Sequence, residues 1–223
     1  MHQRISKKFL FYLFILAFLG TVNNIDVNRF NFPKIKDIKI SGLEGDNNSY
    51  LLENIKNLDL GNIFFLNDIE IQNMINSNNL IEKYNIFKKY PSSLNVKIDK
   101  TKFLARITNK DGIYLLGSNG KLTKDNFNND FLPFIDGSPS ISEFLKFKKI
   151  IDNSKFEYQN IKNLFFFPSK RWDIETNNEI VIKLPKDETE QVLNLIYQMI
   201  FNQNFKDIKI IDARIKNQII IDD

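Results

Sequence analysis

Cysteine is absent from this 223-residue chain, and histidine occurs once, at His2. Without cysteine there is no disulfide framework, thiol nucleophile or thiolate metal site. Because His2 lies ahead of the first long apolar run, the rest of the chain also lacks the imidazole of Ser-His-Asp triads and common zinc sites. The sequence therefore predicts no catalytic residues, no metal site and no cofactor, and it disfavours an enzyme.

The chain also lacks a concentrated basic face. It carries 31 basic and 27 acidic residues, and the basic residues Arg4, Lys7 and Lys8 all precede the apolar run, whereas the first acidic residue is Asp26. Without those three, 28 basic residues nearly balance 27 acidic ones. Proteins that bind duplex nucleic acid carry a basic face, so we predict no nucleic-acid binding. The hydrophobic fraction of 43% is that of a globular chain with room for one or two domains.

The one long hydrophobic run is FLFYLFILAFLGTV, residues 9–22. As a helix it would rise about 21 Å, and extension to Val27 gives about 28 Å, close to the roughly 30 Å of a bilayer core. We therefore predict a single transmembrane helix over residues 9–27. The alternative is a cleaved secretory signal, but small residues are missing from the alternate positions that a cleavage site requires. Basic residues ahead of the span predict that residues 1–8 stay in the cytoplasm and that the chain after about residue 28 is exported.

After a linker over residues 28–34, the pattern predicts strand, helix, helix, strand, strand over 35–100. IKDIKISG (35–42) alternates as a strand does and ends at a glycine. In the first helix we expect Ser49 as the N-cap and Gly61 as a left-handed C-cap. In the second, Asn67 and Glu70 have capping-box spacing, and Ile71, Met74 and Ile75 share a face.

Two alternating runs flank the break YPSS at residues 90–93. Pro91 lacks a backbone donor, so it suits the corner between antiparallel strands. We expect Leu94, Val96 and Ile98 to return along the preceding strand and to face the two helices.

The second half predicts a mainly antiparallel β domain with flanking helices. GIYLLGSNGKL (112–122) and RWDIETNNEIVIKLP (171–185) read as hairpins, the latter turning at Asn177–Glu179, where asparagine tolerates positive φ. LPFIDG (132–137) precedes a helix that Ser140 and Glu143 would cap. That helix would bury Phe144, Leu145 and Ile151, and a later amphipathic one, over 186–203, would carry Val192, Leu195, Ile196, Met199 and Ile200 on one face.

Several residues could be interpreted as functional sites, but for each of them we favour a structural role. Trp172, the only tryptophan, is expected to fill the core rather than to stack on a ligand. Asp212 and Arg214 predict a structural ion pair rather than a catalytic couple. The aromatic run NLFFFPS (163–169) is expected to be a buried strand rather than an exposed edge. Asp111-Gly112 and DETE (187–190) predict a turn and a helix start rather than metal ligands.

In this order, IKISG (38–42), GNIF (61–64) and IEKYNIFKKYPSSLNVKI (81–98) resemble the POTRA domain of the FtsQ/DivIB bacterial division proteins. The segments 112–122, 132–137 and 208–222 resemble the β domain of the same family, although Gly117 stands where the family usually has aspartate. The resemblance covers essentially everything after residue 35. It implies an α+β fold with an N-terminal transmembrane helix, a POTRA domain (35–100) and an FtsQ-type β domain (101–223).

The resemblance further implies a non-enzymatic bitopic scaffold of the division machinery, with no small-molecule substrate. Its partners would be FtsB/FtsL-like coiled-coil proteins and septal peptidoglycan synthases. It would reside in the inner membrane at the division septum, with its C-terminal domains in the periplasm. One alternative is a POTRA-bearing envelope protein of outer-membrane protein assembly or secretion. A periplasmic hydrolase is a third, disfavoured by the missing Cys and His.

The C-terminal strand is the predicted partner-binding surface. QIIID (218–222) alternates as an apolar edge strand, and an uncovered apolar edge requires a pairing strand. The predicted contact residues are Arg214, Ile215, Ile219, Ile220 and Ile221. Ile219 and Ile221 should share one face and Ile220 the other, with the partner-facing side left open. The alternative is that this strand lies inside the sheet.

Overall fold

The computed structural model describes residues 6–21, 33–109, 111–125, 131–200 and 208–222. The first element is the apolar helix α1 (Lys7–Thr21). Within these ranges, no helix combines the length and apolarity needed to cross a membrane. Residues 22–27 of the predicted span, and most of the predicted tail and linker, lie outside the described residues.

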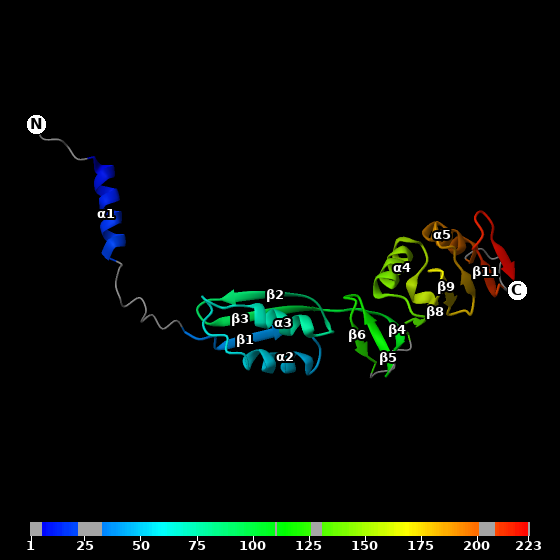
Figure 1. Cartoon of the computed structure of the whole chain (residues 1–223), viewed down its shortest axis with the longest axis horizontal. Coiled ribbons are helices and arrows are strands. Elements are labelled where there is room, and N and C mark those ends of the chain that lie inside the picture. The colour runs from blue at the N-terminus through cyan, green and yellow to red at the C-terminus, as the bar shows by residue number, and fades with distance from the viewer. Residues whose placement is uncertain (1–5, 22–32, 110, 126–130, 201–207, 223) are drawn as a thin grey trace, which may run out of the picture.

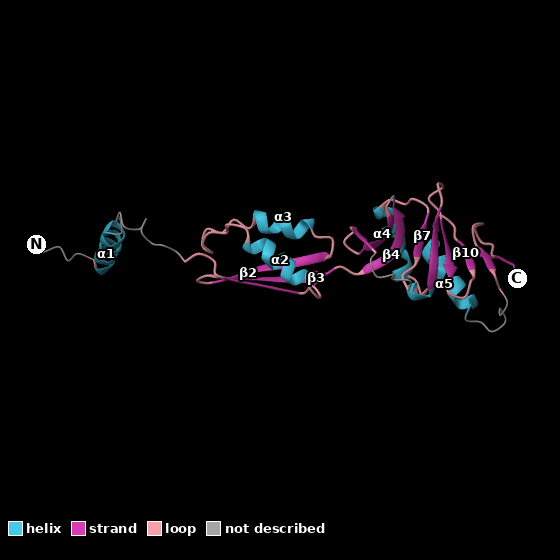
Figure 2. Cartoon of the chain, turned by 90° about the horizontal axis from the view of Figure 1, so that it is seen from below, coloured by secondary structure: helices cyan, strands magenta, loops and turns pink. Residues whose placement is uncertain are grey.

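The first folded unit is a three-stranded sheet with two helices on one face (Figure 2). It comprises β1 (Asp37–Ser41), α2 (Asn47–Lys56), α3 (Ile69–Ser77), β2 (Ile81–Lys89) and β3 (Ser93–Lys100). The order along the chain is the predicted β-α-α-β-β. The last strand, β3, lies in the middle, parallel to β1 and antiparallel to β2.

Alternation in β3 builds the core of this first unit. Leu94, Val96 and Ile98 are buried and belong to one cluster with Ile55 of α2 and Ile71 of α3. The prediction that these strand residues face the helices is confirmed.

Two turns of the first unit depend on the backbone properties of proline and glycine. Pro91 lies in the turn between β2 and β3, as predicted. Gly42, at the end of β1, has a φ of +119°, and a Cβ there would lie 1.8 Å from the carbonyl oxygen of Ile98. Only glycine permits this approach of the two backbones.

The predicted helix caps of the first unit were wrong. α2 begins at Asn47, so Ser49 lies inside the helix, and the N-cap position belongs to Asp46. α2 ends at Lys56, so Gly61 is not its C-cap, although Gly61 does have positive φ (+63°). Asn67 accepts a hydrogen bond from the backbone N–H of Ile69 instead of forming a capping box.

The second unit is a nine-stranded sheet in the order β12-β11-β10-β9-β8-β7-β4-β5-β6. Its strands are β4 (Phe103–Asn109), β5 (Gly112–Gly117), β6 (Leu122–Lys124), β7 (Phe134–Asp136), β8 (Ile161–Phe166), β9 (Trp172–Thr176), β10 (Val181–Lys183), β11 (Ile210–Asp212) and β12 (Ile220–Asp222). The pairs β4–β7, β7–β8 and β10–β11 are parallel, and the others are antiparallel. Its helices are α4 (Ile141–Asn153), the 3-10 turn η2 (Tyr158–Asn160) and α5 (Thr189–Ile200).

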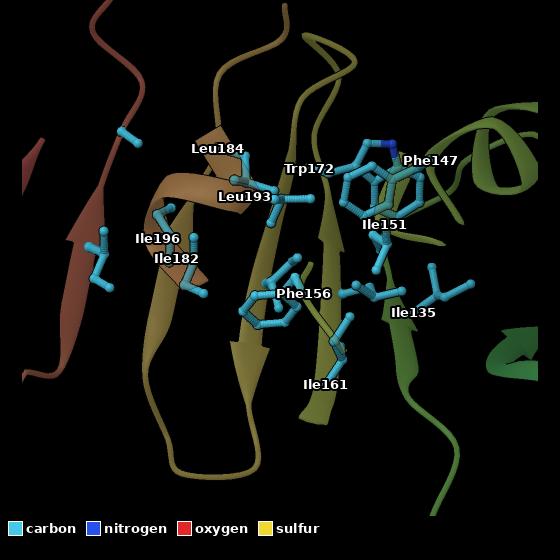
Figure 3. Packing of buried hydrophobic residues seen from close by; sticks show 14 of the residues in the cluster. Ile135, Phe147, Ile151, Phe156, Ile161, Trp172, Ile182, Leu184, Leu193 and Ile196 are labelled. Carbon is cyan, nitrogen blue, oxygen red and sulfur yellow. The ribbon is translucent and has the colours of Figure 1, made fainter. Parts of the chain in front are cut away.

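The main core of the second unit lies between this sheet and the helices α4 and α5 (Figure 3). Trp172 is 7% exposed and its ring stacks on Phe147 at 4.7 Å between centroids, which confirms it as a core residue. The capping box of Ser140 and Glu143 on α4 is present as predicted. β8 is an interior strand and not an edge, although within the aromatic run only Leu164 is buried and the three phenylalanines are half-buried.

Two predictions for the second unit were wrong in detail. In α5 the buried residues are Thr189, Leu193 and Ile196, whereas Leu195 is 48% exposed. Ile196 of the expected face is buried, and Val192 and Ile200 pack against the core, so the core-facing side is shifted toward Leu193 and away from Leu195. In the turn between β9 and β10 the positive φ belongs to Glu179 (+64°), not to an asparagine.

Hydrogen bonds join the two units where the β5–β6 turn meets the start of β2. The Ser118 hydroxyl donates to the Glu82 carboxylate at 2.7 Å. Asn119 donates from its side-chain amide to the carbonyl oxygens of Asn79 and Ile81, both at 2.9 Å. The two units, which follow one another along the chain (Figure 1), are therefore also connected by side chains.

Candidate partner-binding edge

The last described strand, β12, forms one edge of the nine-stranded sheet. It pairs antiparallel with β11, with Ile221 opposite Ile211 and Ile220 opposite Asp212. Among the described residues, no strand pairs with its outer side. An edge strand presents backbone N–H and C=O groups along that side, and such a row can accept a strand from another chain.

The two faces of β12 differ in burial. Ile219 and Ile221 are half-buried and pack against the main core, on the same side as Ile211. Ile220 points the other way and is 45% exposed. The predicted division into two faces holds, and the exposed apolar side chain of the strand is Ile220.

Two ion pairs hold the first half of the segment that connects β11 and β12. Arg214 donates from Nε to the Asp212 carboxylate at 2.8 Å, and Lys216 donates to Glu188 at 2.7 Å. The Arg214 hydrogen bond lowers the pKa of the Asp212 carboxyl, and the Glu188 hydrogen bond raises the pKa of the Lys216 amine. These pairs fix the connecting segment against β11 and against the residues just before α5, so their role is structural.

A groove lies between α5 and this connecting segment. Its volume is about 740 Å³. The apolar part of its lining comes from Val192 and Leu195 on one wall and from Ile215 and Ile219 on the other. Leu195 and Ile215 are 48% and 56% exposed. A groove lined by both polar and apolar side chains therefore adjoins the edge strand, on the helix side of the sheet.

The structure brings the five predicted contact residues into one region. Arg214 and Ile215 lie in the connecting segment, Ile219 precedes β12, and Ile220 and Ile221 lie in it. Sequence reasoning missed Leu195 as a surface residue, because helical periodicity placed it inward. The residues that α5 buries after Thr189 are Leu193 and Ile196, four and seven positions further on.

The described part of the chain contains no group of three His, Asp or Glu side chains that could hold a metal ion. His2 lies outside the described residues. Asp111 adjoins a glycine with φ of +130° at the start of β5, and Glu188 and Asp187 precede α5. These acidic residues occupy the turn and helix-start positions that the sequence predicted.

Two protein-family models match the chain. The model of the FtsQ-type POTRA domain matches residues 33–100, and that of the C-terminal region of the cell division protein FtsQ/DivIB matches residues 105–214. They follow the order that the sequence motifs predicted. No curated protein matches the chain significantly.

Proposed function

Because the chain belongs to the FtsQ/DivIB family of cell division proteins, a family without enzymatic activity, we propose that it is a membrane-anchored scaffold at the division septum. It recruits FtsB/FtsL-like coiled-coil proteins and septal peptidoglycan synthases. The FtsQ type of its POTRA domain does not favour the alternative role in outer-membrane assembly or secretion.

The anchor in this proposal is the apolar segment 9–27, with residues 1–8 in the cytoplasm and the POTRA domain (35–100) and β domain (101–223) in the periplasm. Its support is the composition of α1, which after Lys7 and Lys8 carries no charged residue. The side chains of α1 from Phe9 to Leu19 are exposed, as expected for a helix that requires an apolar environment. Mass spectrometry of the protein purified from membranes should find the original N-terminus. A mature N-terminus near residue 21 or beyond would contradict the anchor.

The observation that carries the proposed recruitment is the exposed edge β12. A partner strand would pair with its outer side through main-chain hydrogen bonds, while apolar side chains of the same partner would enter the groove lined by Leu195 and Ile215. Main-chain pairing supplies affinity, and the groove supplies selectivity for a partner whose strand adjoins an apolar segment.

The test is binding of the full chain to an FtsB/FtsL-like coiled-coil protein, with the substitution Ile220→Lys. Ile220 is on the face of β12 away from the core, so its replacement leaves the core packing intact. Loss of an apolar contact together with burial of a charge should weaken binding by about 2 kcal/mol, roughly thirtyfold.

The matched control is Ile113→Lys, a change at a 43% exposed isoleucine on β5, near the other edge of the same sheet. It should leave binding unchanged. Circular dichroism should show both variants folded. Undiminished binding by folded Ile220→Lys protein would refute β12 as the partner-binding edge. This test is cleaner than truncation after Ile215, which would also remove Ile219 and Ile221 from the core.

A further inference from the structure

A cluster of exposed apolar side chains lies at one end of the first unit. Phe64, Phe65 and Ile69 are 47%, 76% and 59% exposed, and Tyr90 of the β2–β3 turn is 63% exposed. The rings of Phe64 and Tyr90 are 5.0 Å apart between centroids, so the loop before α3 and the turn after β2 form one surface. We call these four residues the aromatic end. Grouped apolar side chains at a surface mark a site of interaction with a partner or a membrane.

The loop that presents the two phenylalanines is held in place. Ile63 and Leu66, on either side of them, are buried. The Asn62 side-chain oxygen accepts hydrogen bonds from the backbone N–H groups of Phe64 and Phe65, both at 3.1 Å. The backbone that carries the two phenylalanines is therefore fixed from both sides.

The chain enters the first unit at this same end. The backbone N–H of Ile35 donates to the carbonyl oxygen of Gly61 at 2.9 Å, and that of Lys36 donates to Ser92 at 2.9 Å. Lys34 forms a β-bridge with Asn62, two residues before Phe64. The junction with the second unit lies at the opposite end of the strands (Figure 1).

The distance between α1 and the aromatic end is bounded by the chain. Residues 22–32 separate Thr21, the last residue of α1, from the first residue described in the first unit. Eleven residues span at most about 40 Å when fully extended. If α1 lies in a bilayer, this end of the first unit is the end that faces the membrane surface, within reach of it.

We propose that the aromatic end docks into the interfacial region of the lipid bilayer. The inference rests on the anchor of the proposed function. Tyr90 suits the headgroup level, because its ring is apolar and its hydroxyl is polar. Lys36 and Lys89, both exposed, lie at the same end and complement anionic headgroups. Docking would orient the first unit upright on the membrane and point the second unit, with β12, away from it.

Measurement of membrane depth by spin labelling tests this docking. Because the chain has no cysteine, a single introduced cysteine is the only site that takes the label. The full chain carrying Phe65→Cys with a nitroxide would be reconstituted into vesicles of phosphatidylethanolamine with a minority of phosphatidylglycerol. The expected result is a higher ratio of oxygen to nickel-chelate accessibility than at a Tyr50→Cys label. Tyr50, on α2, is a 66% exposed aromatic outside the aromatic end. Equal ratios at the two sites would overturn the proposal.

A second substitution tests whether apolar contact causes the depth. With the label kept at residue 65, Ile69→Glu should lower the oxygen-to-nickel ratio toward the value at residue 50, while Tyr50→Glu should leave it unchanged. If the ratio at residue 65 rises only after a division protein is added, the aromatic end binds a protein partner, and lipid docking is refuted. A label at Leu16 in α1 separates the two proposals. If it is not at bilayer depth, the anchor fails, whereas a buried Leu16 with a solvated residue 65 refutes docking alone.

Discussion

The junction between the two units provides a quantitative prediction. Glu82, on β2 of the first unit, accepts hydrogen bonds from Ser118 Oγ at 2.7 Å and from Thr101 Oγ1 at 3.2 Å. Ser118 Oγ also accepts from the backbone N–H of Lys102 at 3.0 Å. Ser118→Ala therefore removes one donor to a carboxylate and one acceptor of a backbone N–H.

The expected loss follows from the environment of these groups. A hydrogen bond to a charged group contributes about 1.5–3 kcal/mol to the free energy of unfolding. Glu82 is only half-buried, so water can replace part of the lost interaction, and we expect the lower end, about 1.5 kcal/mol. Ser138→Ala is the matched control, since Ser138 is exposed and its side chain makes no hydrogen bond with the described residues.

Urea unfolding, followed by the fluorescence of Trp172, measures the loss in free energy of unfolding that Ser118→Ala causes. Trp172 is the only tryptophan and reports on the second unit. A double-mutant cycle with Glu82→Gln should return a coupling free energy of about 1 kcal/mol between the two sites. Additive effects, with a coupling below about 0.3 kcal/mol, would show that Ser118 and Glu82 do not stabilise the junction, and the hydrogen-bond reasoning would be refuted.

Three further predictions concern single sites. Gly61→Val should lower the free energy of unfolding by about 1–2 kcal/mol, because φ is +63° there; an unchanged urea midpoint would contradict this. Trp172→Ala should cost about 3–5 kcal/mol in thermal unfolding followed by circular dichroism, since the indole fills the core, and a loss below about 1 kcal/mol would argue against that role. The hydrogen bond from Arg214 lowers the pKa of Asp212 in the folded state, so this group stabilises the fold above the unfolded-state pKa of about 4 and ceases to do so as pH falls through the lowered value. Asp212→Asn should thus reduce the melting temperature at neutral pH and reduce it less and less as the pH falls through the lowered pKa of Asp212; an equal reduction at every pH would refute the linkage.

Local pattern alone determined much of this protein. Alternation of apolar residues placed β2 and β3, because a strand buried on one face must repeat every second residue. Ser140 and Glu143 marked the start of α4, since a capping box depends only on residues three positions apart. The ordered motifs of both halves identified the family, which the two family models confirm.

Other features depended on contacts between segments far apart in the chain. The sequence did not indicate that β3 would lie between β1 and β2, since strand order is decided by which pairing buries the helices. For α5 the prediction was right for Ile196 but wrong for Leu195, because several rotations of an apolar helix satisfy its periodicity and only the packing beneath it selects Leu193 over Leu195. The gathering of Phe64, Phe65 and Tyr90 at one end is likewise invisible in the sequence, where they are separated by the whole of α3 and β2. Composition and short-range spacing thus determined the elements and the family. Tertiary packing decided the neighbours of each strand and the side chains left at the surface, because burial is a property of the whole assembly of elements and not of any one of them.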